Sequence, residues 1–165
     1  FSLEKAWFEA CLERGRPRGR DPGGAGAIVK TYFDSSAIAK RYIEEPGSQE
    51  VDDLCAKATE VALGVLCMPE IVSALNRRVR ERVLARPEYA KAKRRLMQDV
   101  ADGIIVEITA KVIAASIAIL EASPVRALDA LHIACALEWQ AELFVSSDDR
   151  QLSAARKAGL HVKQV

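Results

Sequence analysis

The stretch that decides the fold is IVKTYFDSSAIAKRYI, residues 28–43. Its first half, IVKTYFD, is a run of β-branched and aromatic residues that ends in Asp34, and it predicts a short buried strand. SSAIAKRYI then places its apolar residues at helical spacing. A strand that leads directly into a helix is typical of a chain in which the two kinds of element alternate.

The alternation of strands and helices continues to the C-terminus. The next predicted elements are a turn and helix over 45–58, a strand over 61–67, and helices over 69–85 and 87–102. They are followed by strands over 104–108, 142–147 and 160–165, and by helices over 110–122, 125–140 and 148–159. Alternation at these lengths indicates an α/β fold with a parallel sheet that helices cover on both faces.

The composition fits one cytosolic domain. The chain has 165 residues, half of them hydrophobic, and a formal net charge of +1. No apolar run approaches the length of a membrane span and no signal-peptide pattern is present, so we expect a cytoplasmic protein without a membrane anchor. The four cysteines are isolated from one another, so we expect reduced, buried thiols rather than a zinc site.

The first 27 residues differ from the rest. Residues 14–26, RGRPRGRDPGGAG, hold five Gly, two Pro and four Arg, a composition that is typical of a linker. The segment before them predicts a short amphipathic helix. We therefore assign residues 1–27 to an N-terminal tail and residues 28–165 to the folded domain.

Positive charge is concentrated in the middle of the chain. Nine Lys and Arg lie between Arg77 and Arg95, against only Glu81 and Glu88. A solvated helical face is one interpretation of this basic segment. We favour the other, in which the segment contacts RNA phosphates, because it continues directly from the predicted helix that begins near Glu70. Its candidate RNA-binding residues are Arg77, Arg78, Arg80 and Arg82.

Three acids follow predicted strands. Asp34 ends the first strand, Asp148 follows the strand over 142–147, and Glu70 lies three residues after the strand over 61–67. Because ligands of an open parallel sheet bind beyond the carboxyl ends of its strands, we expect these acids to meet at one edge. Asp129 lies early in the helix over 125–140, and the pattern alone does not place it at this edge.

Each acid also has a simpler interpretation, as a helix N-cap or a first-turn residue. Several carboxylates at one edge repel each other, however, and a cation would offset that repulsion. Oxygen ligands suit Mg²⁺ or Mn²⁺, which activate water and bind phosphate oxygens, so the chemistry points to phosphodiester hydrolysis. A phosphoaspartate nucleophile at Asp34 is disfavoured, since Ser36 stands where such enzymes carry a second acid.

From about Val29 to the C-terminus, the chain resembles PIN-domain ribonucleases, most closely the VapC-type toxins of toxin–antitoxin pairs. The resemblance rests on four segments in order: VKTYFDSSAIAKRYIEEPGS (29–48), PEIVSALNRR (69–78), RALDALHIACAL (126–137) and FVSSDDRQLSAARKAGL (144–160). It implies a three-layer α/β/α domain with a mainly parallel sheet, and an endoribonuclease that uses one or two Mg²⁺ or Mn²⁺ ions. The metal-binding and catalytic residues that it implies are Asp34, Glu70, Asp129 and Asp148.

The resemblance also implies supporting residues and partners. Ser36 and Ser146 match hydroxyl positions that support the acids, and Asp149 is an alternative to Asp148 with a supporting role. The expected partners are an RNA substrate, a small antitoxin protein and a second copy of the chain in a homodimer. His132 shares a helix face with Asp129, where a general base is conceivable, but we favour a structural histidine with satisfied hydrogen bonds.

Two other functions remain open. A PIN-domain nuclease of RNA processing or decay would have the same site without being a toxin. A catalytically inert PIN scaffold would bind RNA or protein, but such a protein is expected to have lost acids that are all present here.

Overall fold

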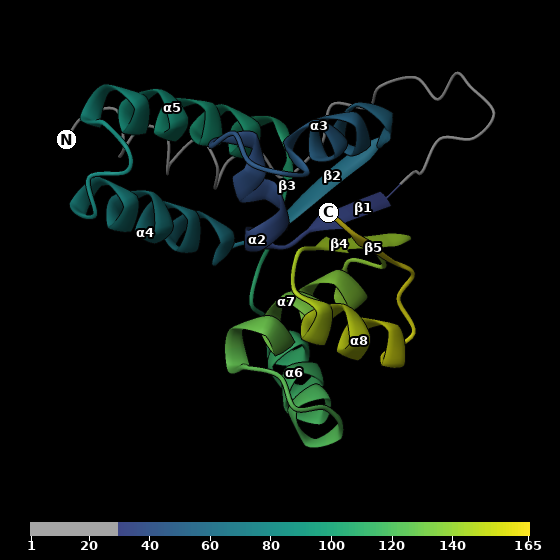
Figure 1. The fold of residues 1–165 in the computed structure, drawn as a ribbon. Helices are drawn as coiled ribbons and strands as arrows, with labels where there is room; N and C mark the ends of the chain where they lie inside the picture. The colour runs from purple at the N-terminus through teal and green to yellow at the C-terminus, as the bar shows by residue number, and fades with distance from the viewer. Residues whose placement is uncertain (1–29) are drawn as a thin grey trace.

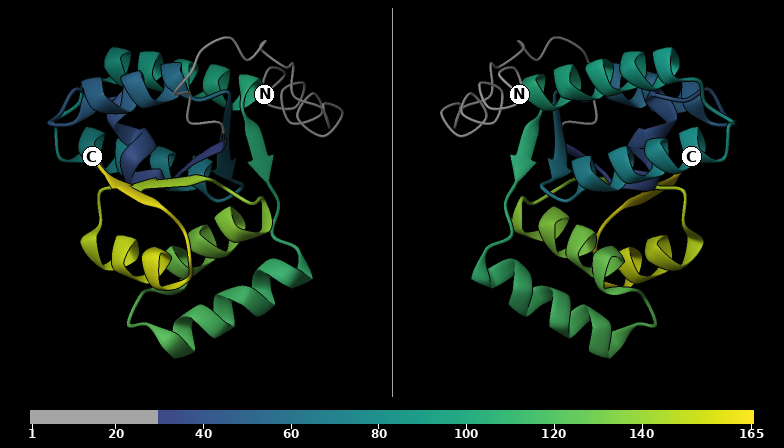
Figure 2. Two further views of the ribbon diagram at one scale, coloured as in Figure 1. Left: turned by 90° about the vertical axis from the view of Figure 1, so that its right-hand side faces the viewer. Right: turned by 90° about the vertical axis from the view of Figure 1, so that its left-hand side faces the viewer.

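The computed structural model of the chain describes residues 30–165, so the predicted N-terminal helix and linker lie outside the described part (Figures 1 and 2). Five strands form one sheet in which every neighbouring pair is parallel. The strands are β1 (Lys30–Phe33), β2 (Glu60–Gly64), β3 (Ile104–Val106), β4 (Leu143–Ser146) and β5 (Val162–Gln164). Their order is β3-β2-β1-β4-β5, which puts β1 at the centre of the sheet.

Helices cover both faces of the sheet, as predicted. They are α2 (Ser35–Ile38), the 3₁₀ helix η1 (Ala39–Arg41), α3 (Ser48–Lys57), α4 (Cys67–Arg80), α5 (Arg86–Asp102), α6 (Ala110–Ala122), α7 (Ala127–Glu138) and α8 (Asp149–Lys157). Figure 1 shows α2 to α5 on one face and α6 to α8 on the other. The three-layer α/β/α architecture is thereby confirmed.

The core divides into two clusters, one on each face of the sheet. Tyr32 and Phe33 are neighbours on β1 and both have no exposed surface, but they point to opposite faces because side chains alternate along a strand. Tyr32 packs with Phe144 of β4 and with α7, and the two rings stack at a centroid distance of 5.7 Å. Phe33 packs with Leu63 of β2 and with α2 and α4.

Two predicted element ends differ from the structure by three residues or more. The helix predicted over 69–85 ends at Arg80, because Arg82 has a positive φ of 60° and the N–H groups of Val83 and Leu84 both turn back to the Arg78 carbonyl. The strand predicted over 61–67 ends at Gly64, and Cys67 already begins α4. Within residues 30–165, none of the helices combines the length and apolar character that crossing a membrane requires.

Candidate metal-binding and catalytic site

Asp34 lies directly after β1, at the centre of the sheet's carboxyl edge. Its backbone N–H donates to the Val145 carbonyl at 3.0 Å, which continues the pairing of β1 with β4. Its carboxylate caps α2 by accepting the Ala37 N–H at 2.9 Å. The Ser36 hydroxyl lies 2.9 Å from both carboxylate oxygens, and the Ser146 hydroxyl lies 3.2 Å from Oδ2. These contacts fix the orientation of the carboxylate.

Burial makes the charge of Asp34 costly. The residue is only 5% exposed, and burial raises its pKa above the usual range, although the nearby His132 and the hydrogen bonds from Ala37, Ser36 and Ser146 lower it. An ionised carboxylate in such a place needs a compensating positive charge. A bound cation would therefore stabilise the ionised form of the Asp34 carboxylate.

Glu70 lies in the first turn of α4, the helix that follows β2, and β2 is the neighbour of β1 in the sheet. Its Oε2 accepts a short hydrogen bond from the Ser35 hydroxyl, and it lies 2.7 Å from Nε2 of His132. Burial raises the pKa of Glu70, but the hydrogen bonds from His132 and Ser35 lower it by more, so the net shift is downward. The geometry keeps this carboxyl group ionised.

Asp148 begins the third segment of the site, at the end of β4. Its Oδ1 accepts the Arg150 N–H at 2.8 Å and so caps α8, while its own N–H donates to the Ser146 hydroxyl at 3.0 Å. Through Ser146 it is joined to Asp34. Asp149 is the first residue of α8 and is exposed. Of the two adjacent acids, Asp148 is the one connected to Asp34.

Asp129 lies in the first turn of α7, where its Oδ2 accepts the Arg126 N–H at 3.1 Å. Gln151 connects it to the other acids. The Gln151 amide donates from Nε2 to the Asp129 carbonyl at 3.4 Å, and its Oε1 lies 2.7 Å from the Ser146 hydroxyl. Pattern alone did not place Asp129; the structure places its backbone beside α8.

Hydrogen bonds through Ser146 and Gln151 connect Asp34, Asp148 and the backbone of Asp129, but the acids do not form a finished metal site. Among the residues that the structure describes, no group of three or more His, Cys, Asp or Glu side chains stands ready to hold a metal ion. Asp129 and Asp148 turn toward the N–H groups of their own helices instead. The donor chemistry nevertheless fits Mg²⁺ or Mn²⁺, since all four side chains offer carboxylate oxygens.

Other donor types near the site are already engaged or protonated. Both ring nitrogens of His132 have partners, because Nδ1 lies 2.9 Å from the Tyr32 hydroxyl while Nε2 faces Glu70. Burial raises the pKa of the Cys67 thiol well above its usual range and that of Cys135 to about 11. The described cysteines, Cys55, Cys67 and Cys135, are free thiols, and of these Cys67 and Cys135 are buried.

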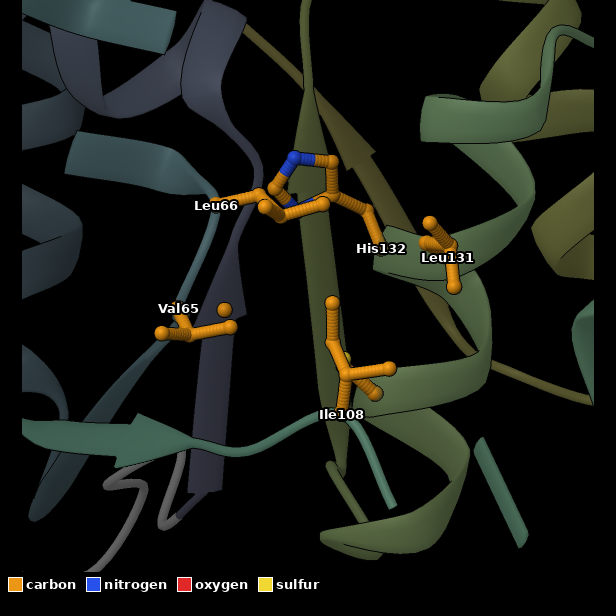
Figure 3. Close-up of a pocket in the computed structure, with 7 residues that line it drawn as sticks. Val65, Leu66, Ile108, Leu131 and His132 are labelled. Carbon is orange, nitrogen blue, oxygen red and sulfur yellow. The ribbon is translucent and has the colours of Figure 1, made fainter. Parts of the chain in front are cut away.

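Sequence reasoning missed several residues of this edge. It gave no role to Tyr32, Ser35 or Gln151, and it treated His132 as structural without identifying its partners. The only sequence signals were the position of Ser35 directly after Asp34 and the shared helix face of His132 and Asp129. In Figure 3 the His132 ring reaches from α7 toward Leu66, the residue before α4, beside a cavity of about 10 Å³ that Val65, Ile108 and Leu131 help to line.

The basic segment begins at the far end of α4. Arg80 follows Glu70 by ten residues, or about 15 Å along the helix axis. Arg77, Arg80 and Arg82 are exposed, whereas the Arg78 guanidinium forms an ion pair with Glu45 at 3.0 Å. Arg78 therefore ties α4 to the loop before α3. Arg80 and Arg82 present their charge to solvent, and the exposed Arg77 has its Nε 3.9 Å from a Glu81 carboxylate oxygen.

A larger cavity of about 480 Å³ lies away from the acids. It is lined by the beginnings of β2 and β3 together with α3 and α5, and by the ion pairs that Arg41 and Arg95 form with Asp52. Since Asp34, Glu70 and Asp148 follow the carboxyl ends of their strands, this cavity is separate from the candidate site.

Known structures share this fold. A toxin–antitoxin complex from Klebsiella pneumoniae is 13% identical over 74% of this chain and 90% of that chain, with a TM-score of 0.58. FitAcB from Neisseria gonorrhoeae is 18% identical over 80% and 95% of the two chains, with a TM-score of 0.60. VapC20, a sarcin–ricin loop cleaving toxin from Mycobacterium tuberculosis, is 17% identical over 79% and 95%, with a TM-score of 0.59.

At these identities the likeness concerns the fold. No curated protein sequence matches the chain. The family comparison is more specific, because the PIN domain model matches residues 31–157, a range that includes all four predicted acids. The chain therefore belongs to the PIN domain family.

Proposed function

We propose that the chain is an endoribonuclease that hydrolyses RNA with the help of Mg²⁺ or Mn²⁺. The observation that carries the proposal is the buried Asp34 carboxylate at the centre of the carboxyl edge of a PIN-domain sheet. Glu70, Asp148 and Asp129 lie on the elements around it. Burial makes this acid costly to ionise, and the hydrogen bonds from two serine hydroxyls and a backbone N–H offset only part of that cost, so a bound cation would stabilise the charge.

The proposed metal ligands are the four acids Asp34, Glu70, Asp129 and Asp148. When bound, a divalent cation lowers the pKa of water and neutralises negative charge on the phosphate. The chain's own part is to hold the carboxylates in place. Ser36 and Ser146 orient Asp34, and Ser35 with His132 orients Glu70. Asp129 and Asp148 would have to turn from their capping positions toward the ion.

RNA binding is proposed for the exposed arginines at the end of α4. Arg77, Arg80 and Arg82 offer charge to phosphates without reading bases, so they contribute affinity rather than sequence preference. Arg78 contributes less in this proposal, because Glu45 already neutralises it.

The test compares two purified variants with the wild type in RNA cleavage with Mn²⁺. Asp34→Asn removes the central carboxylate charge, and we expect it to lower the cleavage rate at least ~100-fold. Asp53→Asn is the control, since Asp53 is an exposed acid on α3, and its rate should equal that of the wild type. Undiminished cleavage by Asp34→Asn would contradict the site assignment.

The proposal extends to a cytoplasmic toxin that forms a homodimer and pairs with a small antitoxin. What supports this is the fold shared with one structure described as a toxin–antitoxin complex and another described as a toxin. Induced expression of the wild type should stop growth, and Asp34→Asn should not. Sequencing RNA 5′ ends after a pulse of each protein would then identify the cut RNA. Cleavage in vitro without growth arrest would instead favour an RNA-processing nuclease, and absence of cleavage would favour an inert scaffold.

A further inference from the structure

Three side chains from distant parts of the chain form a row that leads from the core to the partly exposed Glu70. Tyr32 lies on β1, His132 on α7 and Glu70 on α4, with 100 and 62 residues between successive members. The Tyr32 hydroxyl lies 2.9 Å from Nδ1 of His132, and Nε2 lies 2.7 Å from Oε2 of Glu70. His132 is 4% exposed, so neither nitrogen is available to solvent.

The chemistry of the partners sets the direction of both hydrogen bonds. The ionised Glu70 carboxylate can only accept, so Nε2 of His132 carries the proton that joins them. With that proton on Nε2, an Nδ1 that carries no proton is an acceptor, and the Tyr32 hydroxyl, 2.9 Å away, is placed to donate to it. Burial keeps Tyr32 protonated by raising its pKa. In this row, the Tyr32 hydroxyl therefore donates a hydrogen bond to His132, and His132 donates one to Glu70.

The surrounding structure leaves room for this row and keeps it rigid. A Cβ at Gly64 of β2 would lie 2.5 Å from the Tyr32 hydroxyl oxygen and 3.4 Å from Nδ1 of His132, so only glycine fits there without displacement. The Tyr32 ring stacks on Phe144 with an interplanar angle of 10°. Ser35, directly after Asp34, adds a second donor to Glu70, and its hydroxyl oxygen lies 3.2 Å from Nε2 of His132.

We infer that His132 is a positioning residue for Glu70 and that Tyr32 fixes the tautomer of His132. The inference rests on the proposed function, in which Glu70 is a metal ligand. Hydrogen bonds from neighbouring side chains hold a metal-binding carboxylate in one orientation. Loss of these hydrogen bonds weakens metal binding.

The first test is ¹⁵N NMR of the His132 ring in metal-free protein at neutral pH. In the wild type we expect a proton on Nε2 and an unprotonated, hydrogen-bonded Nδ1. Tyr32→Phe should remove the hydrogen-bond shift at Nδ1 while the protein stays folded, as circular dichroism would verify. A wild-type ring with its proton on Nδ1, or with protons on both nitrogens, would overturn the inference.

The second test is calorimetric titration with Mn²⁺ of two variants at the same position. His132→Leu removes the donor to Glu70 and should weaken Mn²⁺ binding by about 10–100-fold. His132→Gln keeps an N–H donor that can reach the place of Nε2, and we expect its affinity to stay within about threefold of the wild type. Tyr32→Phe should fall between them.

The outcomes separate this inference from the proposed function. Equal Mn²⁺ affinity of the Leu and Gln variants would overturn the positioning role alone. A wild type that binds Mn²⁺ without cutting RNA would overturn the proposed function alone. A wild type that binds no Mn²⁺ would contradict the metal ligation on which both depend.

Discussion

Gln151 of α8 connects parts of the candidate site that lie on three different elements. It is 1% exposed, and its backbone N–H lies 3.3 Å from Oδ1 of Asp148. Its side-chain oxygen accepts from Ser146, and its nitrogen donates to the carbonyl of Asp129. A buried amide that satisfies both ends in this way holds α7, α8 and the end of β4 in one arrangement.

Replacing Gln151 by Leu should therefore affect both stability and activity. The change keeps the approximate volume but leaves the Ser146 hydroxyl and the Asp129 carbonyl without this partner, which costs about 1–3 kcal/mol in the free energy of unfolding. We expect RNA cleavage to fall roughly tenfold, since the support of two proposed ligands is lost. Urea unfolding and cleavage assays measure the two effects. Gln98→Leu, at an exposed position of α5, should change neither.

At the scale of elements, the important feature of β2 is the absence of a side chain at Gly64. Gly64 ends this strand in extended backbone, and its lack of a side chain leaves space for the Tyr32 hydroxyl. Gly64→Ala should lower the free energy of unfolding by about 1–3 kcal/mol through overpacking. Tyr32→Phe removes the oxygen that the new Cβ would meet.

The Gly64→Ala/Tyr32→Phe double variant should consequently lose less stability than the sum of the two single changes. Thermal or urea unfolding of all four proteins measures this coupling. Strict additivity would mean that the methyl group at Gly64 is accommodated without contacting Tyr32.

The α4 helix combines a proposed metal ligand at its start with a basic end. Arg80 and Arg82 are exposed and form no ion pair within residues 30–165. If both contact RNA phosphates, Arg80→Gln/Arg82→Gln should weaken RNA binding and reduce the slope of log affinity against log salt by about 1.4. Fluorescence anisotropy with Asp34→Asn as background measures binding without cleavage. Arg156→Gln, at an exposed position of α8, should leave the slope unchanged.

At the scale of the molecule, periodicity predicted the elements well because each pattern is local. The strand of IVKTYFD and the helix over 110–122 were found where the structure has β1 and α6. The end of α4 was predicted five residues too late, since the basic run after Arg80 keeps good helix formers. Nothing local signals that Arg82 adopts a positive φ.

Only those residues of the candidate site that the order of strands and helices places at the carboxyl edge of the sheet could be predicted. Strand ends brought Asp34, Glu70 and Asp148 to one edge, because parallel strands share their carboxyl edge. The contacts that orient the acids join residues far apart in the chain, such as Ser146 with Asp34, 112 residues earlier. A hydroxyl or an imidazole at such a distance carries no periodic signal, so its partner appears only in the folded chain.

The proposed metal site should also be visible in the stability of the whole protein. A ligand that binds only the folded state at about 100 times its dissociation constant stabilises it by about 2.7 kcal/mol. For a domain of this size that corresponds to a rise in Tm of roughly 5–10 °C. Differential scanning calorimetry with Mn²⁺ should show this rise for the wild type and for Asp53→Asn, and EDTA should reverse it. Asp34→Asn should lose most of the rise, because the central carboxylate is gone, and an equal shift in that variant would place the bound ion elsewhere.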